Sequence, residues 1–255
     1  MKTVGIIPCR LGSTRFPNKP LEQILDLPMI EHVRRRSLLV EQLDDVYIAT
    51  CDEEIKSEVE RHGGRVIMTR ADHTRPSSRV AEAAESIDAD AFFMIQGDEP
   101  LLVPSELDQL ISRFKAIQNE NLVLNLIHKI EKITEVQDLN VVKVSISATG
   151  RIINFTRSPL PCQFAEDVKN YYKQSGLILF SKSALEQFAK TEEGPLERAE
   201  SVDMLRFLEN DSDVYSYYSG NETMAVDLLE HVKLVESSIK NNKTQQSIYN
   251  KIMNR

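Results

Sequence analysis

Two hydrophobic periods alternate along the first hundred residues of the chain. Short continuous apolar runs predict buried strands at 4–7, 46–50, 66–68 and 91–95. Between these runs, apolar residues recur at helical spacing and predict helices at 29–43, 53–62 and 78–87. Strands and helices in strict alternation are typical of an α/β fold, with a mostly parallel sheet flanked by helices.

The second half of the chain has a different pattern. Strand-like segments follow one another with short turns between them, at 123–128, 141–147, 152–155 and 177–180. We expect these segments to form antiparallel additions to the sheet or a small arm. Helices are expected at 196–209 and 228–240, whereas the polar tail after residue 241 lacks a clear apolar face. Because no linker rich in Gly, Pro or Ser interrupts the chain, the sequence favours a single domain over 1–255.

Composition and charge narrow the classes of function. The chain has 255 residues, of which 41 % are hydrophobic, and this is enough to bury a core. Its 31 basic and 39 acidic side chains give a net charge of −8, which argues against a general nucleic-acid binder. No apolar run approaches the roughly 18 residues of a membrane span, and the first apolar stretch is too short for a signal peptide. We therefore expect a soluble, cytoplasmic protein with no nucleic-acid or membrane partner.

A basic loop follows the first expected strand and spans residues 8–20. In an open parallel sheet, ligands bind beyond the carboxyl ends of the strands. The side chains of Arg10, Arg15 and Lys19, with the Ser13 hydroxyl, suit a polyphosphate at this position. The glycine spacing matches neither a Walker A loop nor a dinucleotide-binding fingerprint. The alternative interpretation is a solvated basic turn.

Two acidic residues far apart in the sequence are candidates for a metal site. Asp98 directly follows the buried strand 91–95, where a carboxylate is costly unless it meets a cation. Mg²⁺ usually takes only one or two protein carboxylates and completes its shell with phosphate and water. Asp227, at the start of the last expected helix, is the candidate for a second ligand. The alternatives are a turn-capping Asp98 and a helix-capping Asp227.

Other polar segments give weaker signals. The segment 70–73 follows the third strand and either contacts a base or forms an ordinary turn. Glu197 and Glu200 share a helix face with Arg206 nearby, and surface ion pairing is the default explanation. Arg157 lies between an expected strand and a rigid proline-containing segment.

Several segments occur together in one order along the chain, from about residue 2 to about residue 236. In chain order they are Pro8–Pro20, Ala49–Asp52, Thr69–His73, Gln96–Pro100, Asn140–Val144, Phe155–Pro161, Pro195–Leu196–Glu197 with Glu200, Leu205–Arg206 and Val226–Asp227. Together they resemble the family of 3-deoxy-manno-octulosonate cytidylyltransferases, also called CMP-Kdo synthetases.

The resemblance implies a Rossmann-like nucleotidyltransferase fold and a homodimer built partly from the strand-rich segment 123–180. It implies that CTP and a 3-deoxy-2-ulosonic acid give a CMP-sugar and pyrophosphate, with Mg²⁺ as cofactor, for lipopolysaccharide or cell-surface polysaccharide synthesis. Residues implied at the nucleotide are Arg10, Ser13, Lys19, Arg70, Ala71, Asp72 and Gln96. Residues implied at the sugar acid are Arg15, Gln96, Arg157, Gln174, Glu197 and Glu200. The implied metal ligands are Asp98 and Asp227, which with Arg10 and Lys19 would carry catalysis.

The chain departs from the family pattern at several positions. Asn18 replaces a usual Gly, and Arg75–Arg79 reads Arg-Pro-Ser-Ser-Arg where Ser-Gly-Thr-Glu-Arg is usual. On the sugar side, Gln174–Gly176 and Cys162–Phe164 replace the usual His-Ile-Gly and Trp-Asp-Arg. The nucleotide half is therefore better preserved than the sugar half. Two alternatives remain, namely a nucleotidyltransferase for another acidic sugar (8-amino-Kdo or a nonulosonate) and a non-catalytic nucleotide-binding protein.

Overall fold

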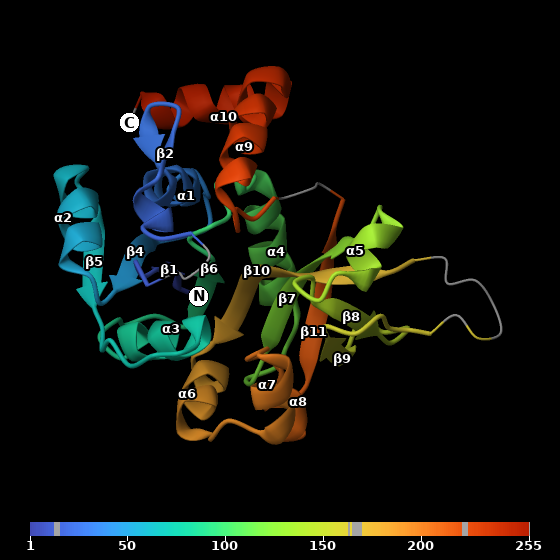
Figure 1. Cartoon of the computed structure of the whole chain (residues 1–255). Helices are drawn as coiled ribbons and strands as arrows, with labels where there is room; N and C mark the ends of the chain where they lie inside the picture. Colours follow the sequence, from blue (N-terminus) through green and yellow to red (C-terminus); the bar gives the residue numbers. More distant parts are fainter. Residues whose placement is uncertain (13–15, 163, 165–169, 221–223, 255) are drawn as a thin grey trace. The chain divides into compact units, whose positions relative to one another are not determined.

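The computed structural model describes residues 1–12, 16–162, 164, 170–220 and 224–254. The chain divides into two compact units (Figure 1). The first unit combines Met1–Arg113 with Thr223–Arg255, and the second is Phe114–Glu222. The single domain expected over 1–255 stays a prediction.

The sheet of the first unit is parallel and has the strand order β6-β1-β4-β5. Its strands are β1 (Thr3–Pro8), β4 (Asp45–Thr50), β5 (Arg65–Met68) and β6 (Ala91–Ile95). Both β1 and β6 are buried along their whole length, as expected for continuous apolar runs in a sheet covered on both faces. Because β1 pairs in register with β6, the loops that follow Pro8 and Ile95 leave the sheet side by side.

Helices and short elements complete the first unit. They are η1 (Lys19–Leu21), β2 (Gln23–Ile24), β3 (Leu27–Pro28), α1 (Met29–Ser37), α2 (Glu53–Arg61), α3 (Pro76–Ala84), α4 (Pro104–Ala116), α9 (Leu229–Asn241) and α10 (Lys243–Met253). The last residues of α4 belong to the second unit. Of the described helices, none combines the length and hydropathy that crossing a membrane requires.

Two sequence expectations for this unit are wrong. The helix expected over 29–43 ends at Ser37, because the Leu39 and Val40 amides donate to carbonyls three residues back and tighten the chain into turns. The tail after residue 241 is expected to lack a clear apolar face, but it forms α10 and buries apolar side chains. Ile248 and Ile252 lie one turn apart on α10 and are buried in one apolar cluster. Tyr249 packs against the same cluster and Gln245 is buried beside it, so α10 has one buried face.

A buried apolar cluster connects the C-terminal segment to the loop after β6. Its members are Phe16, Ile24, Met29, Leu101, Val226, Val232, Val235 and Ile239. Within it the Val226 amide donates a hydrogen bond to the Asp98 carbonyl at 2.9 Å. The fold thus brings together two segments separated by more than half of the chain.

The second unit has a mixed sheet. Its strands are β7 (Val123–Lys129), β8 (Lys143–Ile146), β9 (Ile152–Thr156), β10 (Tyr172–Ser181) and β11 (Val214–Ser219). Strand β11 pairs with β7 in parallel, whereas the β7–β10, β10–β8 and β8–β9 pairs are antiparallel. The expected antiparallel additions are therefore confirmed, and β11 is an addition that the sequence reading missed.

The helices of the second unit are α5 (Ile133–Gln137), α6 (Lys182–Lys190), α7 (Pro195–Glu200) and α8 (Leu205–Glu209). The single helix expected over 196–209 is wrong, because residues 201–204 interrupt it and separate α7 from α8. Ser201 caps α7 with a left-handed φ of 54°, a conformation that stops a helix.

Candidate active site

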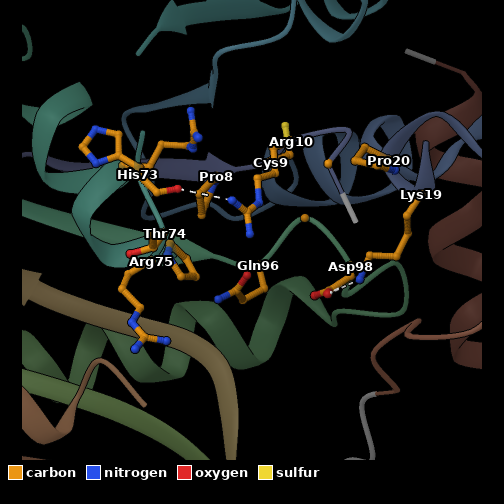
Figure 2. Close-up of a pocket in the computed structure, with 14 residues that line it drawn as sticks. Pro8, Cys9, Arg10, Lys19, Pro20, His73, Thr74, Arg75, Gln96 and Asp98 are labelled. Atoms are coloured by element: carbon orange, nitrogen blue, oxygen red, sulfur yellow. Dashed lines mark hydrogen bonds and ion pairs between the residues drawn. The ribbon is translucent and has the colours of Figure 1, made fainter. Parts of the chain in front are cut away.

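A pocket of about 350 Å³ opens in the first unit at the carboxyl ends of β1 and β6 (Figure 2). Its lining residues come from the loop after β1, from the segment 73–79 at the start of α3, and from 96–98 after β6. This is the edge at which open parallel sheets bind ligands. The pocket therefore lies where the sequence predicts ligand binding, beyond the carboxyl ends of the parallel strands.

The charge of the pocket lining is strongly positive, although the whole chain is acidic. Arg10, Lys19, Arg75 and Arg79 line it, and Asp98 is the one carboxylate among the described residues of the lining. Cationic side chains gathered in a cleft attract anions and bind phosphate oxygens through charge-assisted hydrogen bonds. The arrangement therefore suits a polyanionic ligand.

Backbone contacts hold the start of the basic loop against the sheet. The Cys9 amide donates to the Ala49 carbonyl at 3.0 Å, and the Leu11 amide donates to Asp52 Oδ2 at 2.8 Å. Arg10 Nη1 donates to the His73 carbonyl at 3.3 Å, and Figure 2 shows this bond reaching across the pocket. The loop after β1 is thus tied both to β4 and to the segment before α3.

The thiol of Cys9 lies in the pocket lining but is not a nucleophile. Cys9 is buried, and burial raises the pKa of its thiol from 9.0 to about 12. The thiol therefore stays neutral at physiological pH and acts as a small packing group.

Lys19 and Asp98 form an ion pair inside the pocket. Lys19 Nζ donates to Asp98 Oδ2 at 2.6 Å (Figure 2). It also donates to the Val226 carbonyl at 2.9 Å. Only 15 % of the Lys19 side chain and 25 % of the Asp98 side chain are exposed. Asn18 precedes Lys19 with a left-handed φ of 57°, which Asn tolerates better than most residues, so the replacement of a usual Gly is accommodated.

Asp98 and Asp227 come from segments that are hydrogen bonded to each other. Asp227 follows Val226, whose amide and carbonyl contact Asp98 and Lys19 respectively. No group of three or more Cys, His, Asp and Glu side chains suited to a metal occurs in the described part of the chain. A donor set of two carboxylates still fits Mg²⁺, because this ion takes most of its ligands from water and substrate phosphates.

Of the described residues expected at the nucleotide, some line the pocket and others lie outside its lining. Gln96 lines the pocket as expected. Arg70, Ala71 and Asp72 are exposed and are not among the lining residues, and the Arg70 side chain pairs with Asp72 at 3.7 Å and with Glu82 at 3.5 Å. Their contact with a base stays a prediction. Two further expected residues, Ser13 and Arg15, lie outside the described residues.

Two arginines of the pocket were missed as site residues. Arg79 is 3 % exposed, and its Nη1 donates to the Thr69 hydroxyl and to the Arg70 carbonyl. It lies in the first turn of α3 because this helix begins at Pro76 and not at residue 78 as expected. Proline is favoured in the first turn of a helix, so Pro76 is the sequence signal that could have located both Arg79 and Arg75.

Arg157, in the second unit, is engaged by backbone groups of that unit. Its Nε donates to the Glu200 carbonyl at 2.5 Å, Nη1 to the Leu139 carbonyl at 2.9 Å, and Nη2 to the Ser201 carbonyl at 3.2 Å. The Glu200 carboxylate accepts hydrogen bonds from the Thr156 hydroxyl at 2.7 Å and from the Arg157 amide at 2.8 Å. In this conformation Arg157 and Glu200 connect β9 to α7.

Glu197 and Gln174 also have partners within the second unit. The Glu197 carboxylate is fully buried and accepts two hydrogen bonds of 2.7 Å from Arg206, so the expected surface ion pair is instead a buried one. The Arg206 guanidinium also stacks on the Phe188 ring at 3.9 Å. Gln174 Nε2 donates to Asn125 Oδ1 at 2.9 Å. Roles at the sugar for these residues stay predictions.

Comparisons with known proteins agree with the geometry of the pocket. A family model described as cytidylyltransferase matches residues 4–217. The 3-deoxy-manno-octulosonate cytidylyltransferase of Solibacter usitatus is 36 % identical over 94 % of this chain and 95 % of its own. The 8-amino-3,8-dideoxy-manno-octulosonate cytidylyltransferase of Shewanella sp. strain ANA-3 is 34 % identical over 94 % of this chain and 99 % of its own.

Solved structures give the same result. The structure of a CMP:2-keto-3-deoxy-manno-octonic acid synthetase complexed with CTP has a TM-score of 0.88 and 30 % identity, covering 94 % of this chain and 99 % of the other. A cytidylyltransferase from Leptospira borgpetersenii, at 18 % identity and a TM-score of 0.67, shares the fold. The expected nucleotidyltransferase fold is therefore confirmed. Since the family model and these relatives span most of the sequence, the chain belongs to the cytidylyltransferase family of enzymes.

Proposed function

We propose that this enzyme transfers the cytidylyl group of CTP to a 3-deoxy-2-ulosonic acid of the Kdo type, releasing pyrophosphate. The observation that carries the proposal is the cationic pocket at the ends of β1 and β6, whose lining includes the carboxylate of Asp98. The likeness to a synthetase solved with CTP supports CTP as the anion.

The reaction is an in-line displacement at the α-phosphorus of CTP. The anomeric hydroxyl oxygen of the sugar forms a bond to this phosphorus, the bond to the β-phosphate oxygen breaks, and the hydroxyl proton is released. Such transfers depend on alignment and charge neutralisation more than on covalent catalysis. Arg10 and Lys19 neutralise the triphosphate, and Arg75 and Arg79 add positive charge to the same pocket.

We assign Mg²⁺ as the cofactor and Asp98 and Asp227 as its protein ligands. These two carboxylates would hold the ion, and its chemistry there would be to polarise a phosphate oxygen and neutralise its charge. The hydrogen bond between the Val226 amide and the Asp98 carbonyl supports this assignment, because it holds the two acidic segments together. Gln96 lines the pocket between Asp98 and the start of the 73–79 segment, where it is available to the nucleotide or the sugar (Figure 2).

The family pattern is less well preserved on the sugar side, and the similar enzymes are named for two sugars, Kdo and 8-amino-Kdo. Kdo has a hydroxyl group at C8 where the 8-amino sugar has an amine, so a substrate panel distinguishes them. The retained pocket cations and the similar enzymes disfavour a non-catalytic binding protein. A cytoplasmic location, a homodimer and a place in lipopolysaccharide or cell-surface polysaccharide synthesis stay predictions.

The test is a pyrophosphate-release assay with a panel of acidic sugars. Purified enzyme, CTP and Mg²⁺ are incubated with Kdo, 8-amino-Kdo or a nonulosonate. We expect release with Kdo and little with the nonulosonate. Release only with another sugar contradicts the assigned substrate, and CTP binding by calorimetry without release from any sugar favours the non-catalytic alternative.

A further inference from the structure

We propose that the Lys19 ammonium is a built-in competitor for the cation at Asp98. In the nucleotide-free enzyme it neutralises this carboxylate, and a divalent ion gains full access only when Lys19 moves to the phosphates of the nucleotide. The inference rests on the metal role of Asp98 in the proposed function, and it assigns to Lys19 a role besides phosphate binding.

Lys19 Nζ contacts both acidic segments at once, the one that contains Asp98 and the one that contains Asp227. The ammonium lies 2.6 Å from Asp98 Oδ2 and 2.9 Å from the carbonyl of Val226, the residue before Asp227. A carboxylate and a carbonyl oxygen are ligands that a hard divalent cation also takes. Lys19 therefore occupies oxygen ligands suited to a metal ion.

Electrostatics make the two cations mutually exclusive. The Asp98 side chain is largely shielded from water, so its charge is weakly screened and its pairing with an ammonium is strong. A divalent ion approaching the pair meets a neutralised carboxylate and a positive charge. Arg10, Arg75 and Arg79 add to that positive potential, and it disfavours a metal ion without a nucleotide.

A nucleotide reverses this situation. Its phosphates bring negative charge into the pocket, and the flexible four-carbon stem of Lys19 lets the ammonium turn toward them. Asp98 then becomes available. If bound nucleotide raises the affinity of the enzyme for the metal ion, bound metal ion raises its affinity for the nucleotide by the same factor.

A purely structural role for Lys19 predicts the opposite sign. If the ammonium served only to hold Asp98 and the Val226 carbonyl in place, its removal would loosen the ligands and weaken metal binding. If it competes, its removal strengthens metal binding in the absence of nucleotide. The direction of the change separates the two roles.

The experiment titrates Mn²⁺ alone into nucleotide-free full-length enzyme and measures free Mn²⁺ by electron paramagnetic resonance. The variants are Lys19→Met, which keeps the side-chain volume without the charge, Lys19→Arg, which keeps the charge, Asp98→Asn, and the Lys19→Met/Asp98→Asn double variant. Lys56→Met removes a half-buried lysine of α2 that pairs with Glu53 at 3.3 Å, and it controls for the change in net charge.

We expect Lys19→Met to bind Mn²⁺ on the order of tenfold more tightly than the unsubstituted enzyme, with no such gain in Lys19→Arg or Lys56→Met. The gain should disappear in the double variant, because it acts through Asp98. If Lys19→Met does not fold, judged by its circular dichroism, Lys19→Gln replaces it with the same expectation.

Equal or weaker Mn²⁺ binding by Lys19→Met, while Asp98→Asn still reduces binding, overturns the competitor role and leaves the proposed metal site intact. Mn²⁺ binding that is unaffected by Asp98→Asn in either background overturns the metal assignment itself, and the inference with it. The two failures are therefore distinguishable.

Discussion

Asp52, at the carboxyl end of β4, is a positioning residue for the phosphate-binding loop. Its carboxylate accepts the Leu11 amide at 2.8 Å, and this is the residue after Arg10. A hydrogen bond from a backbone amide to a carboxylate is stronger than one between neutral groups. The path of the loop, and with it the position of the Arg10 guanidinium, therefore depends on a side chain between β4 and α2.

We predict that Asp52→Ala raises the KM for CTP by about tenfold, because the Leu11 amide loses a charged acceptor. Asp52→Asn keeps an acceptor oxygen at the same position and should restore most of the affinity. Steady-state kinetics with CTP varied provides the measurement, and kcat should change less than KM. An Asp52→Ala enzyme with an unchanged KM for CTP would show that the loop does not need this contact.

At the scale of single residues, the sequence predicts the polar groups that follow strands directly. Arg10, Lys19, Gln96 and Asp98 lie in the pocket because strand ends meet at one edge of a parallel sheet. The sequence does not predict that Lys19 bonds to Asp98, since that contact depends on the turn around η1. It also does not single out Arg75 and Arg79 as pocket residues, because strand ends are easier to locate from sequence than helix starts.

At the scale of elements, α10 is the part that periodicity misses. Gln245 of α10 is buried, its Nε2 donates to the Leu101 carbonyl at 2.8 Å, and its Oε1 accepts from Arg36 Nη1 at 2.7 Å. Arg36 Nη1 also donates to the Leu102 carbonyl at 3.1 Å. These contacts hold Leu101 and Leu102, in the segment that follows Asp98. Periodicity misses Gln245 because a polar residue that is buried by hydrogen bonding does not add to a hydrophobic pattern.

The contact between α1 and α10 also predicts a pH dependence of stability. His32 of α1 is fully buried, stacks on Tyr249 at 5.7 Å, and donates from Nε2 to the Ile24 carbonyl at 2.7 Å. Burial lowers the pKa of His32 from 6.5 to about 4. The unfolded state therefore binds a proton that the folded state does not, and stability is lost as the pH falls from 6.5 toward 4.

The measurement is urea unfolding near pH 7 and near pH 4.5, for the unsubstituted enzyme and for His32→Gln, whose amide keeps a donor for Ile24. We expect His32 to contribute about 2 kcal/mol to the loss of unfolding free energy between these pH values, and His32→Gln to lack that share. An equal loss in both proteins would mean that the His32 pKa is not lowered in the folded state.

At the scale of the whole molecule, charge is distributed unevenly between surface and site. The net charge of −8 predicts a protein that is not a general nucleic-acid binder. This total does not show that, among the described residues, four basic side chains line the pocket. The alternating strands and helices predict the first unit well, because its buried strands read as continuous apolar runs. The second unit is harder to predict, since half-buried strands and short helices such as α7 and α8 depend on long-range pairing.

The residues expected at the sugar lie mostly in the second unit. There Arg157, Glu197 and Glu200 already have partners. The sequence indicates the ion pair of Glu197 with Arg206, but not the hydrogen bonds of Arg157 and Glu200, because backbone groups supply most of them. Family membership establishes a cytidylyltransferase, whereas the sugar depends on these less well preserved segments.

The most direct test of the central proposal is Mg²⁺-dependent pyrophosphate release from CTP and Kdo by Asp98→Asn. This substitution keeps the shape of the side chain and removes the charge that the cation needs. We predict that turnover falls by several powers of ten while circular dichroism and thermal unfolding stay close to those of the unsubstituted enzyme. Activity within about tenfold of the unsubstituted enzyme would contradict the assignment of Asp98 as the metal-binding carboxylate of the reaction.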